Sequence, residues 1–203
     1  QFGVESAYFF DVQVCYFILP PLKSGLDVRS IYASLLRIFA ESKLSGTVNP
    51  VMYSRYEMVQ TIVYAHKNKL IDAAASYHKA ISEREKDPSI IGFLLHAVML
   101  RKLSFAYYKN SDYERAKFYL CKIHKNAWTE SVQKTLVVYW IFLYKNFIGA
   151  RKGRDNVGMC ALQEASKVRI SDERCNMLLA QIAYQVRRWD ELKNYSEAVI
   201  SVN

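Results

Sequence analysis

The chain has 203 residues, 51% of them hydrophobic, with only 7 glycines and 4 prolines. A sequence so rich in apolar residues is not a disordered chain, and its length suffices for one large domain or for a row of small stacked units. Its formal net charge of +9 favours anionic partners, namely acidic proteins, nucleic acids and anionic membrane surfaces.

Helix-capping residues and helix breakers divide the sequence into about ten helices. The first is expected from about Ser6 to the Pro20-Pro21 pair, where an α-helix must stop. The Asn49-Pro50 pair supplies a cap and a first-turn proline for another. Turn signals arrive about every twenty residues, which argues against an all-β sandwich or barrel. The other helices are expected to begin at or near Asp27, Leu70, Ser89, Asp112, Thr129, Asp155 or Asn156, Ser171 and Trp189.

Short connections pair these helices into antiparallel hairpins with a regular spacing. The second helices of successive pairs are expected near Asp27, Leu70, Asp112, Asp155 and Trp189, which lie 43, 42, 43 and 34 residues apart. Such a period is typical of a helical repeat array, in which each hairpin buries its apolar face by stacking on the next. The expected units are a helix pair over residues 1–48 and repeats over residues 49–88, 89–128, 129–170 and 171–203.

The stretch from Leu100 to Ile123 has the clearest repeat pattern. Its first helix carries large residues around a small serine, an Asp-Tyr pair makes the turn, and its second helix carries a small residue followed by large ones. These positions are Leu100, Leu103, Ser104, Tyr107, Asp112, Tyr113, Ala116, Leu120 and Ile123. Small residues let two helices approach closely while bulky ones interdigitate around the contact. This pattern resembles the tetratricopeptide (TPR) repeat.

Weaker matches extend the resemblance over about residues 50–203. The pattern recurs over residues 64–80 and 179–199, and Gly158, Leu162 and Ala165 are its remnant between them. The spacing of about 42 residues is longer than the usual 34. The resemblance implies an all-α, right-handed TPR-like α-solenoid of about five antiparallel hairpins that acts as a non-catalytic scaffold or adaptor. Because the chain begins with Gln1 rather than methionine, we expect it to be a fragment of a longer subunit of a protein complex.

In TPR-like proteins the first helices of the hairpins line a concave groove that receives a partner. The positions that match this face are Arg101, Phe105, Tyr108, Lys109, Val137, Ile141, Tyr144, Lys145, Met177, Gln181 and Tyr184. Cations beside aromatic rings suit an acidic or amphipathic segment of a partner protein, because Arg and Lys pair with carboxylates and the rings supply buried area. The alternative is that neighbouring repeats cover the rings and that the cations only solvate the surface.

Nucleic acid is the alternative ligand. Residues 101–154 hold twelve Lys and Arg against three acidic residues, and a basic segment with nearby rings suits phosphates and bases. However, Arg101 and Lys109 are expected on the groove face, whereas Lys117, Lys122 and Lys125 are expected on the convex face. The segment 149–156, GARKGRDN, is expected to be a loop and lacks the Gly-Lys-Ser/Thr ending of a P-loop.

No catalytic, metal or cofactor site is expected. The four cysteines share no spacing, which argues against a disulfide framework or a zinc site and indicates an intracellular protein with reduced thiols. Cys121 and His124 lack a second pair nearby, so we interpret them as a core cysteine and a surface histidine. The longest apolar run, residues 136–144, is too short for a bilayer, which needs about 20 residues. It is expected to be a helix buried on several sides, and the oligomeric state stays open.

Overall fold

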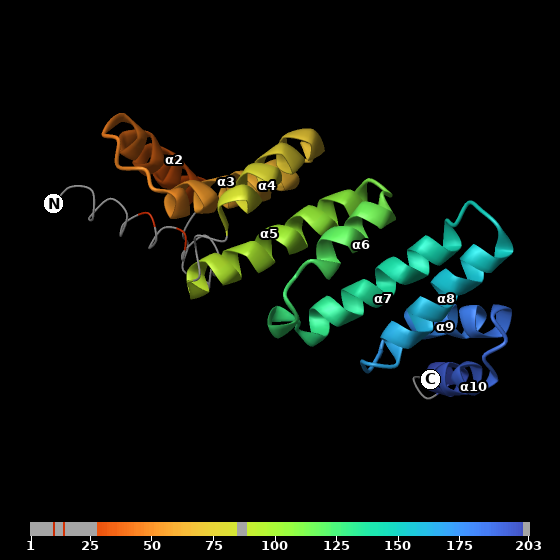
Figure 1. The fold of residues 1–203 in the computed structure, drawn as a ribbon. Coiled ribbons are helices and arrows are strands. Elements are labelled where there is room, and N and C mark those ends of the chain that lie inside the picture. The colour runs from red at the N-terminus through yellow and green to blue at the C-terminus, as the bar shows by residue number, and fades with distance from the viewer. Residues whose placement is uncertain (1–9, 11–13, 15–27, 85–88, 201–203) are drawn as a thin grey trace. The chain divides into compact units, whose positions relative to one another are not determined.

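The computed structural model of the chain describes residues 28–84 and 89–200, together with Phe10 and Val14. Within these residues every regular element is helical, so the all-α prediction is confirmed (Figure 1). The elements are α2 (Val28–Leu44), α3 (Pro50–His66), α4 (Leu70–Arg84), α5 (Ile90–Lys109), α6 (Tyr113–Cys121), a 3-10 turn η1 (Lys125–Ala127), α7 (Glu130–Lys145), α8 (Arg151–Ala165), α9 (Glu173–Gln185) and α10 (Trp189–Ile200). Apart from Phe10 and Val14, the predicted first helix lies outside the described residues.

The chain divides into two compact units, an N-terminal unit of residues 1–106 and a C-terminal unit of residues 107–203. The division falls within the last turn of α5. Each unit is therefore described by itself.

Four of the described helices begin at the capping residue that the sequence predicts. Asn49 Oδ1 accepts a hydrogen bond of 2.8 Å from the Met52 backbone N–H at the start of α3. The same arrangement caps three other predicted helices, with Ser89, Asp112 and Thr129 as the acceptors. The cap of α9 is Asp172 rather than Ser171. Side-chain acceptors at these positions satisfy N–H groups that have no partner within the helix.

Three of the turns between helices share one backbone geometry. The second residue after the helix has a φ of 60–61°, and the next backbone N–H donates to a carbonyl five residues earlier at 2.8–3.0 Å. This left-handed cap satisfies a carbonyl of the last helical turn. The residues with positive φ are Asn68 between α3 and α4, Ser111 between α5 and α6, and Arg187 between α9 and α10.

Equivalent positions are buried in three segments that begin with α4, α6 and α8. Each segment buries three positions with the spacing i, i+4 and i+7, and the first of the three is small. The buried sets are Ala73, Tyr77 and Ala80 on α4, Ala116 and Leu120 on α6 with Ile123 two residues after its end, and Gly158, Leu162 and Ala165 on α8. In the segment that begins with α6 these are the residues expected to carry the repeat pattern, and Ser104 before them on α5 is also buried.

The predicted start of α8 is wrong. The helix begins at Arg151, several residues before the expected Asp155 or Asn156, and its N-cap Ala150 makes no side-chain hydrogen bond. The Phe147 ring, rather than a polar capping residue, packs at the start of α8. A Cβ atom on Gly149 or Gly153 would lie 2.8 or 2.7 Å from the Phe147 ring, so the ring packs where side chains are missing. Asp155 lies inside the helix, where its carboxylate is 3.9 Å from Arg151 Nε.

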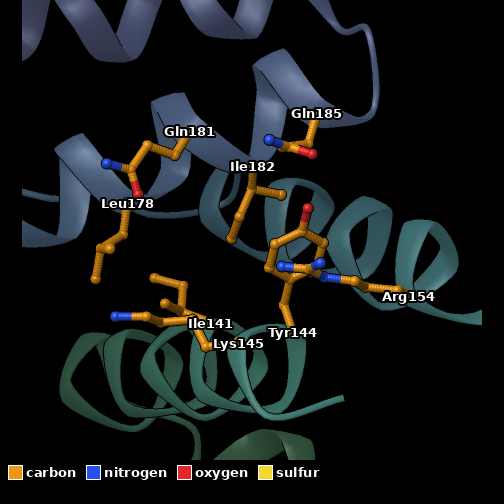
Figure 2. Close-up of a pocket in the computed structure, with 8 residues that line it drawn as sticks. All are labelled: Ile141, Tyr144, Lys145, Arg154, Leu178, Gln181, Ile182 and Gln185. Atoms are coloured by element: carbon orange, nitrogen blue, oxygen red, sulfur yellow. The ribbon is translucent and has the colours of Figure 1, made fainter. Parts of the chain in front are cut away.

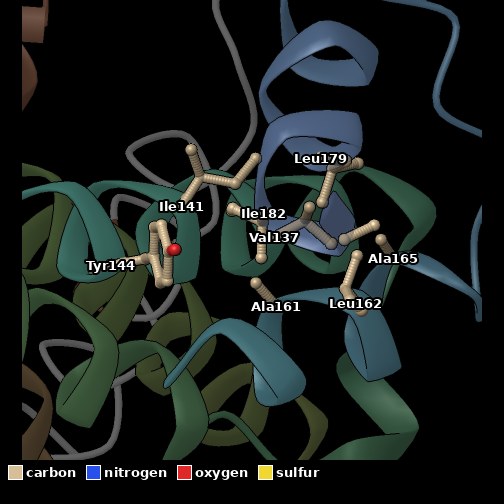
Figure 3. Packing of buried hydrophobic residues seen from close by; sticks show 9 residues of the cluster. Val137, Ile141, Tyr144, Ala161, Leu162, Ala165, Leu179 and Ile182 are labelled. Carbon is tan, nitrogen blue, oxygen red and sulfur yellow. The ribbon is translucent and has the colours of Figure 1, made fainter. Parts of the chain in front are cut away.

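Helix α7 is the centre of the C-terminal unit. It contacts α6, α8 and α9, as expected for a helix buried on several sides. Figure 3 shows how its side chains meet those of α8 and α9 in one apolar cluster. The cluster consists of Val137, Ile141, Tyr144, Ala161, Leu162, Ala165, Leu179, Ile182 and Ala183. Gly158 on α8 adds a close contact, since a Cβ atom there would lie 3.1 Å from Tyr144, Ile182 and Val186.

The N-terminal unit buries several polar side chains on α3, which packs against α2 and α4. Gln60 accepts from the Tyr32 hydroxyl at 2.9 Å and donates to the Tyr56 hydroxyl at 2.7 Å. The Tyr56 ring stacks on Phe39 with a centroid distance of 3.7 Å. These bonds satisfy the buried amide and link α2 to α3.

Among the described helices, α5 has the length and composition that a membrane-spanning helix needs. Half of its most apolar window is buried within the protein. A core helix of a soluble protein meets the same criteria.

The left-handed turn residues predict an effect on stability. Ser111→Gly should raise the free energy of unfolding by about 0.5–1 kcal/mol, because glycine adopts a positive φ without the steric cost that other residues bear. Ser111→Ala keeps that cost and should bring no gain. Urea unfolding of the two variants beside the wild type measures the difference, and an equal gain from alanine would contradict the explanation.

The close contact at Gly158 predicts the opposite effect. Gly158→Leu should lower the free energy of unfolding by about 1–3 kcal/mol, because a large side chain must displace Tyr144, Ile182 and Val186 from a packed core. Met159→Leu, on the exposed side of the same helix, is the matched control and should change stability little. Thermal or urea unfolding would reject this account if the Gly158 variant were as stable as the control.

Candidate functional site

A pocket of about 230 Å³ lies within the C-terminal unit, between α7, α8 and α9 (Figure 2). Its lining residues are Ile141, Tyr144 and Lys145 from α7, Arg154 from α8, and Leu178, Gln181, Ile182 and Gln185 from α9. Small-molecule sites usually have volumes of about 300–1,000 Å³. The pocket is therefore small, and its size suits one side chain of a ligand better than a cofactor.

The floor of the pocket belongs to the hydrophobic core. Ile141, Ile182 and Tyr144 have exposed fractions of 1%, 2% and 5%, and all three are members of the apolar cluster around α7. Side chains packed at core density stay in their rotamers. The floor is thus a preformed apolar surface, and it needs no rearrangement before a ligand binds.

Two cations give the pocket its charge. Lys145 is the exposed last residue of α7, and Arg154 lies in the first turns of α8 with its guanidinium carbon 4.5 Å from the centre of the Tyr144 ring. Figure 2 shows this guanidinium lying against the ring. A cation over an aromatic face is attracted to the ring's negative face, which holds the arginine at the pocket. Lys145 and Arg154 form no ion pair within residues 28–84 and 89–200.

Two amides complete the rim. Gln181 and Gln185 are exposed residues one helical turn apart on α9, and both line the pocket. Their side-chain amides make no hydrogen bond to other described residues. Since an amide both donates and accepts, the pair leaves donors and acceptors available at the edge of a cationic, apolar hollow.

The chemistry of the pocket follows from these parts. No acidic residue lines it, so an anion meets two positive charges and no carboxylate that repels it. Ile141 and Ile182 below accept apolar atoms. The arrangement suits a carboxylate on a short apolar stem, with Arg and Lys as charge-assisted hydrogen-bond donors.

The structure brings together four of the predicted groove residues. Ile141, Tyr144, Lys145 and Gln181 line the same pocket. Met177 and Tyr184, also predicted, are 46% and 60% exposed on α9. Tyr184 meets Trp189 edge to face at a centroid distance of 6.0 Å.

Other predicted groove residues do not offer a free surface. Val137 is 0% exposed, so its expected place on an open groove is corrected, whereas Ile141 is 1% exposed and contributes only to the pocket floor. Helices α6, α8 and α9 contact α7 on several sides. Tyr108 is half-buried, and its ring stacks on Tyr139 at 4.9 Å and meets Phe142 edge to face.

The remaining predicted residues lie on α5. Lys109 is an exposed residue of the C-terminal unit. Arg101 is exposed and Phe105 is 47% exposed, and both belong to the N-terminal unit. Each of these side chains is accessible within its own unit.

Sequence reasoning missed Arg154 and Gln185. The sequence predicts a loop at Arg154 because the start of α8 carries no capping residue. Gln185 lies four residues after the predicted Gln181, and this helical spacing alone places both on neighbouring turns of one face. The wrong helix boundary therefore explains why Arg154 is not predicted as a site residue, whereas the helical spacing from Gln181 is enough to predict Gln185.

A second, more open hollow of about 510 Å³ lies at the ends of α5, α6 and α7. Asp112 and Glu114 line it, together with the exposed Ile148. Both carboxylates already have partners, since Asp112 lies 3.3 Å from Arg115 and Glu114 lies 3.1 Å from Lys117. The hollow therefore offers no unpaired group comparable to those of the α7–α9 pocket.

The cysteine and histidine pair differs from its interpretation in one respect. Cys121 is exposed rather than part of the core, because it is the last residue of the short helix α6. His124 is exposed as expected, and its Nδ1 accepts from the Asn126 backbone N–H at 3.3 Å.

Burial raises the pKa of the Cys175 thiol to about 11, and Asp172 beside it acts in the same direction. Among the residues that the structure describes, no three His, Cys, Asp or Glu side chains gather as a metal site.

Much of the basic excess of residues 101–154 has local partners. Lys117 Nζ lies 4.2 Å from the centre of the Trp140 ring, and Lys122 Nζ lies 4.6 Å from that of Phe118. Lys134 pairs with Glu130 at 2.7 Å. By contrast, the pocket cations Lys145 and Arg154 form no ion pair with any residue that the structure describes.

Comparison with known proteins gives no relative from which a role could be transferred. The chain matches no protein-family model, no curated protein and no solved structure.

Proposed function

We propose that the chain is a non-catalytic helical-repeat scaffold that binds an acidic segment of a partner protein at the α7–α9 pocket. The observation that carries the proposal is the pair of cations, Lys145 and Arg154, above an apolar floor with no acidic residue in the lining. An aspartate or glutamate side chain has the charge and size that such a pocket selects. Flanking residues of the segment would then lie on exposed parts of α7 and α9.

The repeat architecture of the proposal is a right-handed, TPR-like α-solenoid. Three turns of the same left-handed geometry and three segments with equivalent buried positions support it. Within the C-terminal unit each helix contacts the next, and α7 also contacts α9. Stacking of first helices on first helices is what a solenoid requires. In the proposed array, exposed residues of the first helices bind partner proteins. The array itself has no catalytic role in this proposal.

The proposal favours an acidic protein segment over nucleic acid. Lys117 and Lys122 lie on aromatic rings, and such contacts occupy ring faces on which bases would have to stack. The pocket holds two cations, and neutralising two phosphates releases few counterions and therefore contributes little to nucleic-acid affinity. A protein ligand needs only one well-seated anchor and modest contacts around it.

The compartment that we propose for the chain is intracellular.

The direct test uses a synthetic library of linear ten-residue peptides, each with one central glutamate and no basic residue. The tightest binder becomes a fluorescent probe for anisotropy titrations of the full chain. Lys145→Ala and Arg154→Ala should each weaken its binding by about 1–3 kcal/mol, which is a roughly fivefold to 150-fold rise in Kd, because each removes a charge-assisted hydrogen bond. Changing the central glutamate to glutamine should have a similar effect.

Lys152→Ala is the matched control, because Lys152 is an exposed cation on α8 that does not line the pocket. Equal effects of all three alanine variants would show that only overall charge matters. A random single-stranded oligonucleotide is titrated in parallel at several salt concentrations. If it bound more tightly than every peptide and with a steep salt dependence, the nucleic-acid alternative would replace the proposal.

A further inference from the structure

We infer that the partner segment binds in an extended conformation along α9, with Gln181 and Gln185 reading its backbone and one acidic side chain seated in the pocket. This inference rests on the proposed function and sharpens it. It selects an extended acidic segment over an amphipathic helix as the ligand of this site.

The first argument is the spacing of the two amides. Gln181 and Gln185 are four residues apart on α9, and a helix rises 1.5 Å per residue, so they are spaced about 6 Å along its axis. An extended chain rises about 3.3 Å per residue and presents every second peptide group to the same side, about 6.6 Å apart. The amides therefore match alternate peptide groups of a segment that runs along α9.

The second argument is that the two side-chain amides have no hydrogen-bond partner among the described residues. Neither makes a hydrogen bond to another described residue, and both line the pocket (Figure 2). An amide beside a bound peptide needs a donor and an acceptor, which the N–H and C=O groups of an extended backbone supply. A helical ligand has already paired these groups internally along most of its length. It would leave both glutamines facing an apolar or side-chain surface.

The third argument is the capacity of the pocket. Its volume of about 230 Å³ receives one side chain, while the seam of an amphipathic helix needs several hollows along its i, i+3, i+4 and i+7 positions. In an extended segment the side chains next to the acid point away from the protein, and those two positions away point back toward it. Exposed Met177 and Tyr184 lie one turn before and one turn after Gln181, where such residues would find apolar contact.

These arguments predict an Asp- or Glu-centred recognition motif with an apolar residue two positions from the acid. Specificity would be divided between the parts of the site. Lys145 and Arg154 select the charge, the floor of Ile141 and Ile182 accepts the stem, and the two glutamines fix the direction and register of the backbone.

The experiment combines protein variants with backbone-modified probes, and it uses the full chain. The probe is the tightest glutamate-centred peptide from the synthetic library. The double variant Gln181→Leu/Gln185→Leu should raise its Kd at least tenfold, while Gln163→Leu, an exposed glutamine of α8 outside the pocket, should leave it unchanged. Circular dichroism confirms that the variants keep their helical content.

A series of probes that are N-methylated at one amide each tests the conformation of the bound peptide. An extended ligand predicts that methylation weakens binding at alternate positions beside the glutamate and is tolerated between them. A hydrocarbon-stapled, helical version of the same sequence should bind at least tenfold more weakly than the linear probe. Tighter binding of the stapled helix, or no effect of both the methyl groups and the glutamine substitutions, would overturn the inference.

The experiments distinguish a failure of the extended-backbone inference from a failure of the proposed function. If Lys145→Ala and Arg154→Ala weaken binding but the glutamine variant and the methylated probes do not, the pocket binds an acidic anchor and only the extended-backbone inference is wrong. If neither cation variant weakens binding, the proposed function of the pocket is wrong as well.

Discussion

The burial of α7 is the constraint on which the C-terminal unit depends. Its side chains pack against α8 and α9 in one cluster, and α6 contacts it as well. A helix enclosed in this way loses a large area of apolar surface from water, which is the main favourable contribution to folding. The same packing fixes Ile141 and Tyr144 in the floor of the pocket. Stability and the candidate site therefore share the same residues.

The pocket exists because α8 approaches α7 closely and starts early. Gly158 has no side chain where Tyr144, Ile182 and Val186 lie within 3.1 Å of the position of a Cβ atom. Because the helix begins at Arg151, Arg154 is on its first turns and reaches the Tyr144 ring. The guanidinium of Arg154 lies against an aromatic face, and the neighbouring Asp155 pairs with Arg151 instead, so among the described residues no carboxylate neutralises the Arg154 charge.

Local signals in the sequence predicted much of the fold and part of the site. Asn49, Ser89, Asp112 and Thr129 cap helices as expected, because a capping residue acts within a few residues of itself. The start of α8 was missed because it depends on the Phe147 ring packing over two glycines, which is a contact rather than a capping motif. The burial of Val137 and Ile141 depends on three neighbouring helices at once. Periodicity along a single helix does not contain that information.

The measurement that tests the central role of α7 most directly is hydrogen exchange of the full chain, followed by mass spectrometry. Amides of the α7 core, residues 136–144, should be the slowest to exchange in the C-terminal unit, because opening them requires the loss of packing on several sides. The amides of α10, whose helix contains no fully buried residue, should exchange much faster. Exchange of α7 as fast as that of α10 would contradict the account, since the pocket floor would then not be a rigid part of the core.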